Sequence, residues 1–182
     1  VRLVVAEGHL LRDAGRHAEA FALLDKTLAS QPDDPDILYE TALAAEKIGN
    51  LDLAERHLRR LIVLKPESPQ GYNALGYSFA DRNIRLDEAV QLIDKALVLS
   101  PDDGYILDSK GWVLFRQGKL AAALEVLQKS YAKQPDAEVA AHIGEVLWAM
   151  GRRDEALAIW REASKAYPAN EVLSSTIKRF VP

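Results

Sequence analysis

The sequence predicts an all-α fold, a solenoid of five helix hairpins followed by a C-terminal capping helix. Three observations support this prediction. A proline recurs every 33 to 35 residues, small residues recur in step with it, and the apolar residues between follow a helical period. The prolines are Pro32, Pro66, Pro101, Pro135 and Pro168. A unit of about 34 residues has room for two helices and two short connections.

Small residues recur at two positions of every unit. The first position holds Gly8, Ala42, Gly76, Gly111 and Gly144, and the second, 12 or 13 residues later, holds Ala20, Ala54, Ala89, Ala123 and Ala156. The two series fall on different helices of the same unit. Small side chains at these positions let the two helices approach closely.

Helix ends are marked within each unit. Glycine can close a helix in the left-handed conformation, and it stands between the two predicted helices at Gly15, Gly49, Gly118 and Gly151. The third unit has Asn83 there, in a connection one residue longer, and Asn tolerates that conformation. Expected N-caps are Asp34 before Pro35, Ser68 before Pro69, and Asp136. Between such ends, Leu120, Leu124, Leu127 and Tyr131 form one apolar helical stripe.

The two ends of the chain lead to different expectations. Asn170 is a predicted N-cap, followed by an apolar stripe of Leu173, Ile177 and Phe180 that suits a capping helix. The start has no Met, and its apolar residues from Leu3 to Val5 have no preceding helix to cover them. We therefore expect a fragment of a longer repeat protein, a monomer or a weak dimer through this uncapped face. The predicted single domain spans 1–182, with repeats 1–34, 35–68, 69–103, 104–136 and 137–170 and a capping helix 171–182.

Composition argues against several classes of function. The net charge is −4, and no segment has the basic surplus that nucleic-acid binding requires. The absence of cysteine excludes disulfides and thiolate metal ligands from these residues. No apolar run is long enough to insert into a membrane. We expect no nucleic-acid partner, no metal and no cofactor.

Catalytic patterns are also missing. The sequence lacks a glycine-rich phosphate loop, H-E-x-x-H and G-x-S-x-G. Its four histidines, one of them His142, do not share a face, so each is expected to be an exposed or half-packed helix residue. The best catalytic set is Asp108, Ser109 and His142, but Asp108 and Ser109 are adjacent and point about 100° apart on a helix. The prediction is a protein that is not an enzyme.

The repeated positions resemble the tetratricopeptide repeat, whose pattern is W-x2-L-G-x2-Y followed by Ala, an aromatic residue and Pro. The third unit matches it at Leu75, Gly76, Phe79, Ala89 and Pro101. The resemblance covers five units, residues 1–170, although none has the early Trp. It implies a right-handed superhelix whose first helices line a concave groove that binds a peptide or protein segment.

The repeat register gives the candidate binding residues of that groove. They are Tyr39, Leu43, Asn73, Tyr77, Tyr105, Asp108, Trp112, Phe115, Glu145 and Trp148. Tyr and Trp favour a binding role, because such side chains dominate binding hot spots. For Trp112 and Phe115, packing into the neighbouring repeat is the alternative. The Lys, Asn and Arg positions with which chaperone adaptors bind a C-terminal carboxylate are not matched by Val5, His9, Tyr39 and Leu43.

Residues 73–156 also resemble the C-terminal region of large tetratricopeptide lipoproteins of Gram-negative bacteria, some of them adaptors of a carboxyl-terminal processing protease. This resemblance implies an adaptor or scaffold in the periplasm or at the outer membrane, with an envelope protease as partner. Without it, the cytoplasm is the expected compartment. Two alternatives stay open: a structural spacer or capping end of a longer solenoid, and an accessory domain that regulates an enzyme. The sequence does not identify the ligand.

Overall fold

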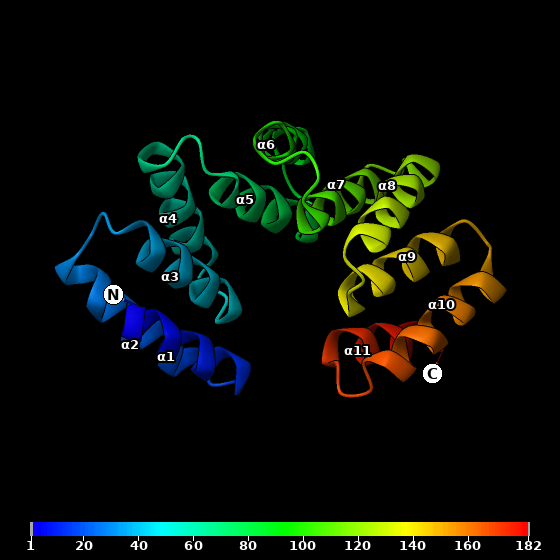
Figure 1. Ribbon diagram of the computed structural model, residues 1–182, viewed down its shortest axis with the longest axis horizontal. Coiled ribbons are helices and arrows are strands. Elements are labelled where there is room, and N and C mark those ends of the chain that lie inside the picture. Colours follow the sequence, from blue (N-terminus) through cyan, green and yellow to red (C-terminus); the bar gives the residue numbers. More distant parts are fainter. Residues whose placement is uncertain (1, 182) are drawn as a thin grey trace. The chain divides into compact units, whose positions relative to one another are not determined.

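The computed structural model describes residues 2–181, and this part of the chain forms eleven helices and no strand, which confirms the all-α prediction (Figure 1). The first helices of the five pairs are α1 (Arg2–Asp13), α3 (Pro35–Lys47), α5 (Pro69–Asp81), α7 (Gly104–Arg116) and α9 (Ala137–Ala149). The second helices are α2 (His17–Ser30), α4 (Leu51–Leu64), α6 (Leu86–Leu99), α8 (Leu120–Lys133) and α10 (Arg153–Ala166). A final helix, α11 (Glu171–Phe180), follows.

The chain divides into two compact units within α5, between Leu75 and Gly76. Unit 1 is described over residues 2–75 and unit 2 over residues 76–181. The single domain 1–182 and its repeat boundaries stay a prediction, and its end residues Val1 and Pro182 lie outside the described residues. Unit 1 contains α1 to α4, with contacts between α1 and α3 and within each pair. In unit 2, α7 contacts α8 and α9, and α9 contacts α10 and α11.

The two series of small residues lie where the helices of a pair meet, as predicted. All ten residues are buried. A Cβ on Gly76 would be 2.6 Å from Ile93 Cγ1, and one on Gly111 or Gly144 would overlap Leu127 or Trp160. These contacts leave no room for a larger side chain on the first helix, so the repeated Gly and Ala set the distance between the paired helices.

The turns also follow the predicted pattern. Gly15, Gly49, Gly118 and Gly151 have φ between 72° and 80°, and Asn83 has φ 55°, so it does replace a left-handed glycine. The extra residue of this connection has an effect that the sequence did not predict. Arg85 is left-handed as well, with φ 45°, and its guanidinium lies 4.0 Å from the centre of the Phe79 ring.

Helix starts are capped largely as expected. The side chains of Asp34, Asp136 and Asn170 accept hydrogen bonds from backbone N–H groups in the first turns of α3, α9 and α11. Asp103 caps α7 in the same way, which sequence reasoning missed. The capping helix is confirmed too: α11 packs on α9 and α10, and its Leu173 is buried. None of the helices within residues 2–181 is long and apolar enough to cross a membrane.

Candidate functional site

The structure places the ten candidate residues in three classes of exposure. Asp108, Trp112 and Glu145 are buried, and Tyr105 is 55% exposed. The others are half-buried: Tyr39, Leu43, Asn73, Tyr77, Phe115 and Trp148. Tyr39, Leu43 and Asn73 belong to unit 1, and the remaining seven belong to unit 2. The site is therefore best described in unit 2, on the side of the first helices where α7 and α9 meet.

A stacked ring pair joins α7 to α9. The rings of Trp112 and His142 lie 4.0 Å apart and nearly parallel, at 19°. His142 Nδ1 is 2.8 Å from Asp108 Oδ1. Trp112 is 4% exposed and His142 5%. The expectation of an exposed or half-packed histidine is therefore wrong for His142, because Trp112 and Asp108 of the preceding repeat enclose it.

The surroundings of His142 act on its protonation in opposite directions. Burial disfavours the charged imidazolium and lowers the pKa of His142. The charge and the hydrogen bond of Asp108, with the carboxylates of Glu138 and Glu145, favour protonation and outweigh burial. The net result is a pKa for His142 above its ordinary value. A protonated His142 forms a buried ion pair with Asp108 beneath the Trp112 ring.

A second contact joins α5 to α9. The hydroxyl of Tyr77 donates a hydrogen bond of 2.6 Å to Glu138 Oε1, although the two residues are 61 positions apart. Burial raises the pKa of Tyr77 well above its ordinary value, and the negative charge of Glu138 raises it further. Tyr77 therefore keeps its proton at neutral pH and remains a donor. Its ring lies 6.3 Å from that of His142, so both contacts belong to one polar and aromatic cluster.

Arg116 connects the end of α7 to the end of α5. Its Nε and Nη2 donate to the backbone oxygens of Ala80 and Asp81, at 3.1 and 2.8 Å. The Ala80 oxygen also accepts from the backbone N–H of Asn83, so the guanidinium adds hydrogen bonds at the C-terminus of α5, where a helix carries partial negative charge. The same guanidinium lies 4.8 Å from the centre of the Trp112 ring. Sequence reasoning did not identify this contact, since Arg116 is not one of the ten candidate groove residues.

The far end of the cluster is covered by α11. Arg179 Nη2 donates to Glu145 Oε1 at 2.6 Å and lies 3.3 Å from Thr176 Oγ1. Trp148 forms a triangle of aromatic rings with Trp160 and Phe180. Its ring centre is 5.9 Å from that of Trp160 and 5.6 Å from that of Phe180, and the latter two are 5.4 Å apart. Glu145 and Trp148 thus contact residues of their own chain here, and a binding role for them stays a prediction.

Unit 1 has a different arrangement on its first helices. Glu40 is buried, and its carboxylate oxygens lie 2.6 Å from His9 Nε2 and 2.7 Å from Arg12 Nη1. Tyr39 is half-buried beside this group, and burial raises the pKa of its hydroxyl. Sequence reasoning missed Glu40 because its position in the repeat is next to that of the candidate Tyr39 and was not expected to face the groove.

The arrangement offers little for catalysis. Asp108 and His142 have the hydrogen bond of a catalytic dyad, but the hydroxyl of Ser109 donates to the backbone oxygen of Tyr105 at 3.1 Å, within its own helix. Within residues 2–181, no three His, Cys, Asp or Glu side chains are grouped so that they could hold a metal ion. The cluster is suited to holding helices together and to presenting their surface.

Two family models, both described as tetratricopeptide repeat, match this chain. One matches residues 5–69, 42–104 and 82–138, and the other matches residues 114–175. The chain belongs to the tetratricopeptide repeat family. Tetratricopeptide repeats are in general protein-interaction modules, and their fold is typically non-catalytic. The chain is thus a member of a family that binds protein partners.

The chain is similar to parts of two longer known proteins. The chain is 44% identical over 145 residues to the TPR repeat-containing protein PA4667 of Pseudomonas aeruginosa, covering 80% of this chain and 25% of that protein. It is 24% identical over 177 residues to the human Protein O-mannosyl-transferase TMTC1, covering 94% of this chain and 20% of that protein. The chain therefore spans a quarter or less of the length of these relatives.

Solved structures share the fold. TTC0263, a thermophilic TPR protein of Thermus thermophilus, matches with a TM-score of 0.89 and 24% identity, over 98% of this chain and 97% of that chain. MamA of Desulfovibrio magneticus matches with a TM-score of 0.67 and 16% identity, over 93% of this chain and 96% of that chain.

Proposed function

We propose that this chain is a non-enzymatic interaction module that binds a peptide or protein segment on the first-helix side of unit 2, where α7 and α9 meet. The observation that carries the proposal is the exposure of Tyr105, at 55%. Tyr105 begins a row on one face of α7 that continues with Asp108 and Trp112, at i+3 and i+7. An exposed Tyr offers a large apolar ring with a polar tip, the combination that protein interfaces favour.

The buried cluster supports this surface from below. Trp112, His142 and Asp108 fix α7 against α9, and the Tyr77 hydrogen bond to Glu138 fixes α5 against α9. A surface whose supporting side chains are already ordered loses less entropy when a partner binds. The carboxylates of Asp108, Glu138 and Glu145 already have partners in this chain, so we expect the main anchor of the ligand to be apolar.

The test is capture of partners with matched variants. The chain, Tyr105→Ala and Val98→Ala serve as baits in an extract of a Gram-negative cell envelope, with quantitative mass spectrometry. Val98 is the control because it is 75% exposed on a second helix of the same unit. The proposal expects a protein captured by the chain and by Val98→Ala, and lost with Tyr105→Ala at unchanged melting temperature. Identical capture by all three baits contradicts it.

A structural role is the second candidate, because Trp112 and Glu145 are engaged in packing within unit 2. On this account the chain is a spacer or capping end of a longer solenoid. It predicts that substitutions in the cluster lower stability while no exposed residue of the first helices affects capture. The third alternative is an accessory domain that regulates an enzyme. It differs from the other two because it predicts that Tyr105→Ala changes the activity of the bound enzyme.

The adaptor role in the bacterial envelope is a further part of the proposal and rests on the resemblance of residues 73–156 to envelope lipoproteins. Its test is fractionation of cells that express the protein from its own gene, followed by co-purification. The proposal expects the protein in the periplasmic or outer-membrane fraction together with a carboxyl-terminal processing protease. Recovery in the cytosol without a protease contradicts the adaptor role and leaves the binding surface itself unaffected.

A further inference from the structure

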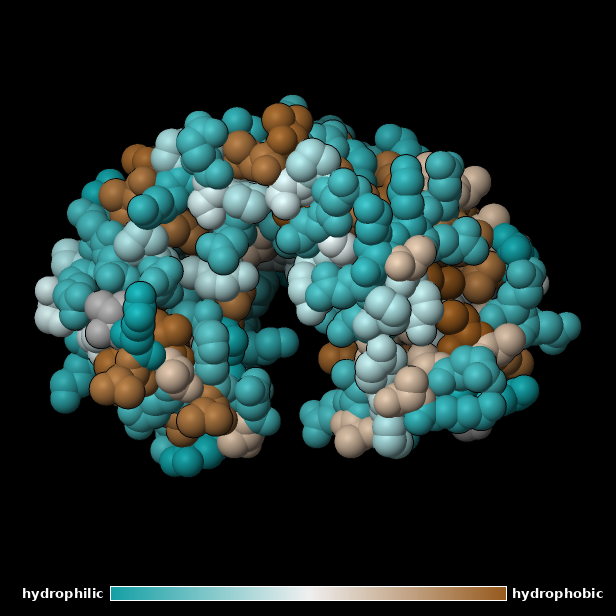
Figure 2. Space-filling model, in the orientation of Figure 1, coloured by the Kyte–Doolittle hydropathy of each residue, from teal (hydrophilic) through white to brown (hydrophobic). Residues whose placement is uncertain are grey.

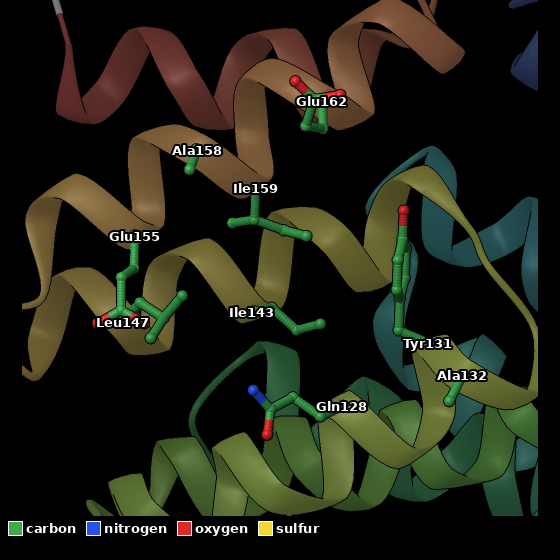
Figure 3. Close-up of a pocket in the computed structure, with 9 residues that line it drawn as sticks. All are labelled: Gln128, Tyr131, Ala132, Ile143, Leu147, Glu155, Ala158, Ile159 and Glu162. Carbon is green, nitrogen blue, oxygen red and sulfur yellow. The ribbon is translucent and has the colours of Figure 1, made fainter.

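A second surface of unit 2 has an open apolar pocket of about 530 Å³ between α8, α9 and α10 (Figure 3). Ile143 and Leu147 of α9 form its floor. Tyr131 and Ala132 line it from α8, and Ala158 and Ile159 line it from α10. Figure 2 shows hydrophobic surface in this part of the chain, with hydrophilic surface on either side. None of these residues belongs to the first-helix cluster.

The shape of the pocket follows from its residues. Ile143 and Leu147 are one helical turn apart and nearly fully buried, so the floor is fixed. Ala132 and Ala158 are exposed and short, so the two second helices leave a channel between them. In Figure 3, the side chains of Ile143 and Ile159 point into this channel and Tyr131 stands at one end. An α-helix of another protein can pack into a channel of this kind between two helices.

The two charged residues that line the pocket are both acidic and lie on α10. Glu155 and Glu162 both line it, seven residues apart on one helix, a spacing of about 10.5 Å. Hydrogen bonds from Arg152 and Lys165 lower the pKa of Glu155 and of Glu162, respectively, so both are ionised at neutral pH. Both are exposed ion pairs between residues three positions apart in sequence. A basic residue of a partner can therefore replace Arg152 or Lys165 at little cost in free energy.

No charged residue of α8 lines the pocket. There the polar lining residue is Gln128, which is neutral. The basic end of α8 is engaged elsewhere, because Lys133 Nζ lies 2.8 Å from Asp102 Oδ1. The pocket thus combines an apolar channel with two carboxylates along one edge.

We propose that this pocket binds an amphipathic helix of a protein partner, which inserts apolar side chains between α8 and α10 and places Lys or Arg against Glu155 and Glu162. The spacing of the two carboxylates matches basic residues seven apart on such a helix. The apolar floor supplies affinity, and the acidic edge sets the orientation of the partner and excludes acidic helices. This site is separate from the first-helix surface proposed above, so either can fail without the other.

The test uses a labelled helical peptide of about 16 residues, with a Leu stripe flanked by two Lys seven positions apart, and a matched peptide with Glu in place of Lys. Fluorescence anisotropy with the full chain is expected to show binding of the Lys peptide at least about tenfold tighter than that of the Glu peptide. Amide shifts in NMR spectra are expected at Gln128, Ile143, Ala158 and Ile159. Added salt weakens the binding.

Two variants and a control locate the site. Glu155→Lys with Glu162→Lys is expected to weaken the Lys peptide about tenfold and to favour the Glu peptide. Ala158→Trp fills the channel and is expected to abolish binding of both peptides. Asp52→Lys with Asp87→Lys makes the same charge change at exposed sites on α4 and α6 and leaves binding unchanged. If Ala158→Trp does not fold, the Glu155→Lys with Glu162→Lys variant, which changes exposed side chains only, decides the test.

Several results overturn the proposal. Equal binding of the two peptides, no binding, or insensitivity to the Glu155→Lys and Glu162→Lys changes excludes a basic helix as ligand. Loss of peptide binding in Tyr105→Ala assigns the peptide to the first-helix surface and leaves the proposed function intact. A dimer in sedimentation that Ala158→Trp converts to a monomer shows that a second copy of the chain covers the pocket.

Discussion

Units 1 and 2 are built from the same helix hairpin, yet they join their first helices in different ways. In unit 1, α1 meets α3 through Glu40, with His9 and Arg12 as its partners at 2.6 and 2.7 Å. In unit 2, α7 meets α9 through the stacked rings of Trp112 and His142, 4.0 Å apart. The side chain of His9 is 46% exposed, whereas that of His142 is 6% exposed. The contact in unit 2 is therefore better shielded from water and salt.

This difference shows that recurring and variable residues have different roles in a repeat protein. The Gly, Ala and Pro positions that recur in both units shape the hairpin. The residues on the first helices vary from repeat to repeat, and they determine which side chains join successive first helices and which are exposed. An aromatic-rich row with an exposed Tyr105 is found in unit 2, and for this reason we propose the binding surface there.

The largest expected effect is a difference in unfolding free energy between Gly→Ala substitutions at the paired-helix contacts of the two units. A Cβ on Gly144 would overlap the buried indole of Trp160, so Gly144→Ala is expected to cost about 3 kcal/mol in unfolding free energy. In unit 1, a Cβ on Gly8 would lie 3.0 Å from the flexible Cδ1 of Leu24, and Gly8→Ala is expected to change stability by less than about 1 kcal/mol. Urea denaturation followed by circular dichroism measures both. Equal costs contradict the different packing of the two sites.

The next effect concerns the His142 contact and its dependence on pH. Because the pKa of His142 is raised in the folded state, its stabilising effect is complete below the ordinary imidazole pKa of about 6.5 and is lost as pH rises through the folded-state pKa. Asp108→Asn removes the carboxylate that raises this pKa. The variant is expected to lose about 2 kcal/mol of stability at pH 6 and less at pH 9. Denaturation at the two pH values measures this, and a loss that grows with pH contradicts it.

A smaller effect is expected at the end of unit 2. Arg179→Ala leaves the buried carboxylate of Glu145 without its guanidinium and is expected to cost about 1 kcal/mol. Hydrogen exchange should become faster in α11, because the ion pair connects that helix to α9. Slow exchange in α11 of the variant contradicts a clamping role for Arg179. The same measurement should show no change in α1 to α4.

The smallest expected effect is the change in stability when the left-handed turn residues of the two units are exchanged. Unit 1 uses Gly15 and Gly49 in the left-handed conformation, whereas the first turn of unit 2 uses Asn83 with φ 55°. Asn83→Gly should remove backbone strain and stabilise the fold by up to about 1 kcal/mol. The converse change, Gly49→Asn, should destabilise it by a similar amount. Thermal unfolding of both variants tests this, and a lower melting temperature for Asn83→Gly contradicts it.

Local signals in the sequence predicted the hairpins, because a recurring Pro, a left-handed Gly and an N-cap such as Asp34 each act within a few residues. The contacts of the candidate site were not predicted. Tyr77 meets Glu138 across 61 residues, and the burial of His142 depends on Trp112 and Asp108 in the preceding repeat. Such contacts depend on the rotation of successive hairpins, which a period of about 34 residues does not specify.

The pocket between α8 and α10 was missed for a related reason. An apolar stripe that includes Tyr131 shows which side of α8 packs, but not where small residues such as Ala132 and Ala158 leave that side uncovered.

The most direct test of the binding surface is photo-crosslinking from the two helix layers of unit 2. A photoreactive phenylalanine analogue is placed at position 105 in one sample and at position 98 in the other, and both are irradiated in cells that express the protein. The account predicts a discrete crosslinked partner from position 105 and none from position 98. A partner crosslinked from position 98 alone would contradict the assignment of binding to the first helices.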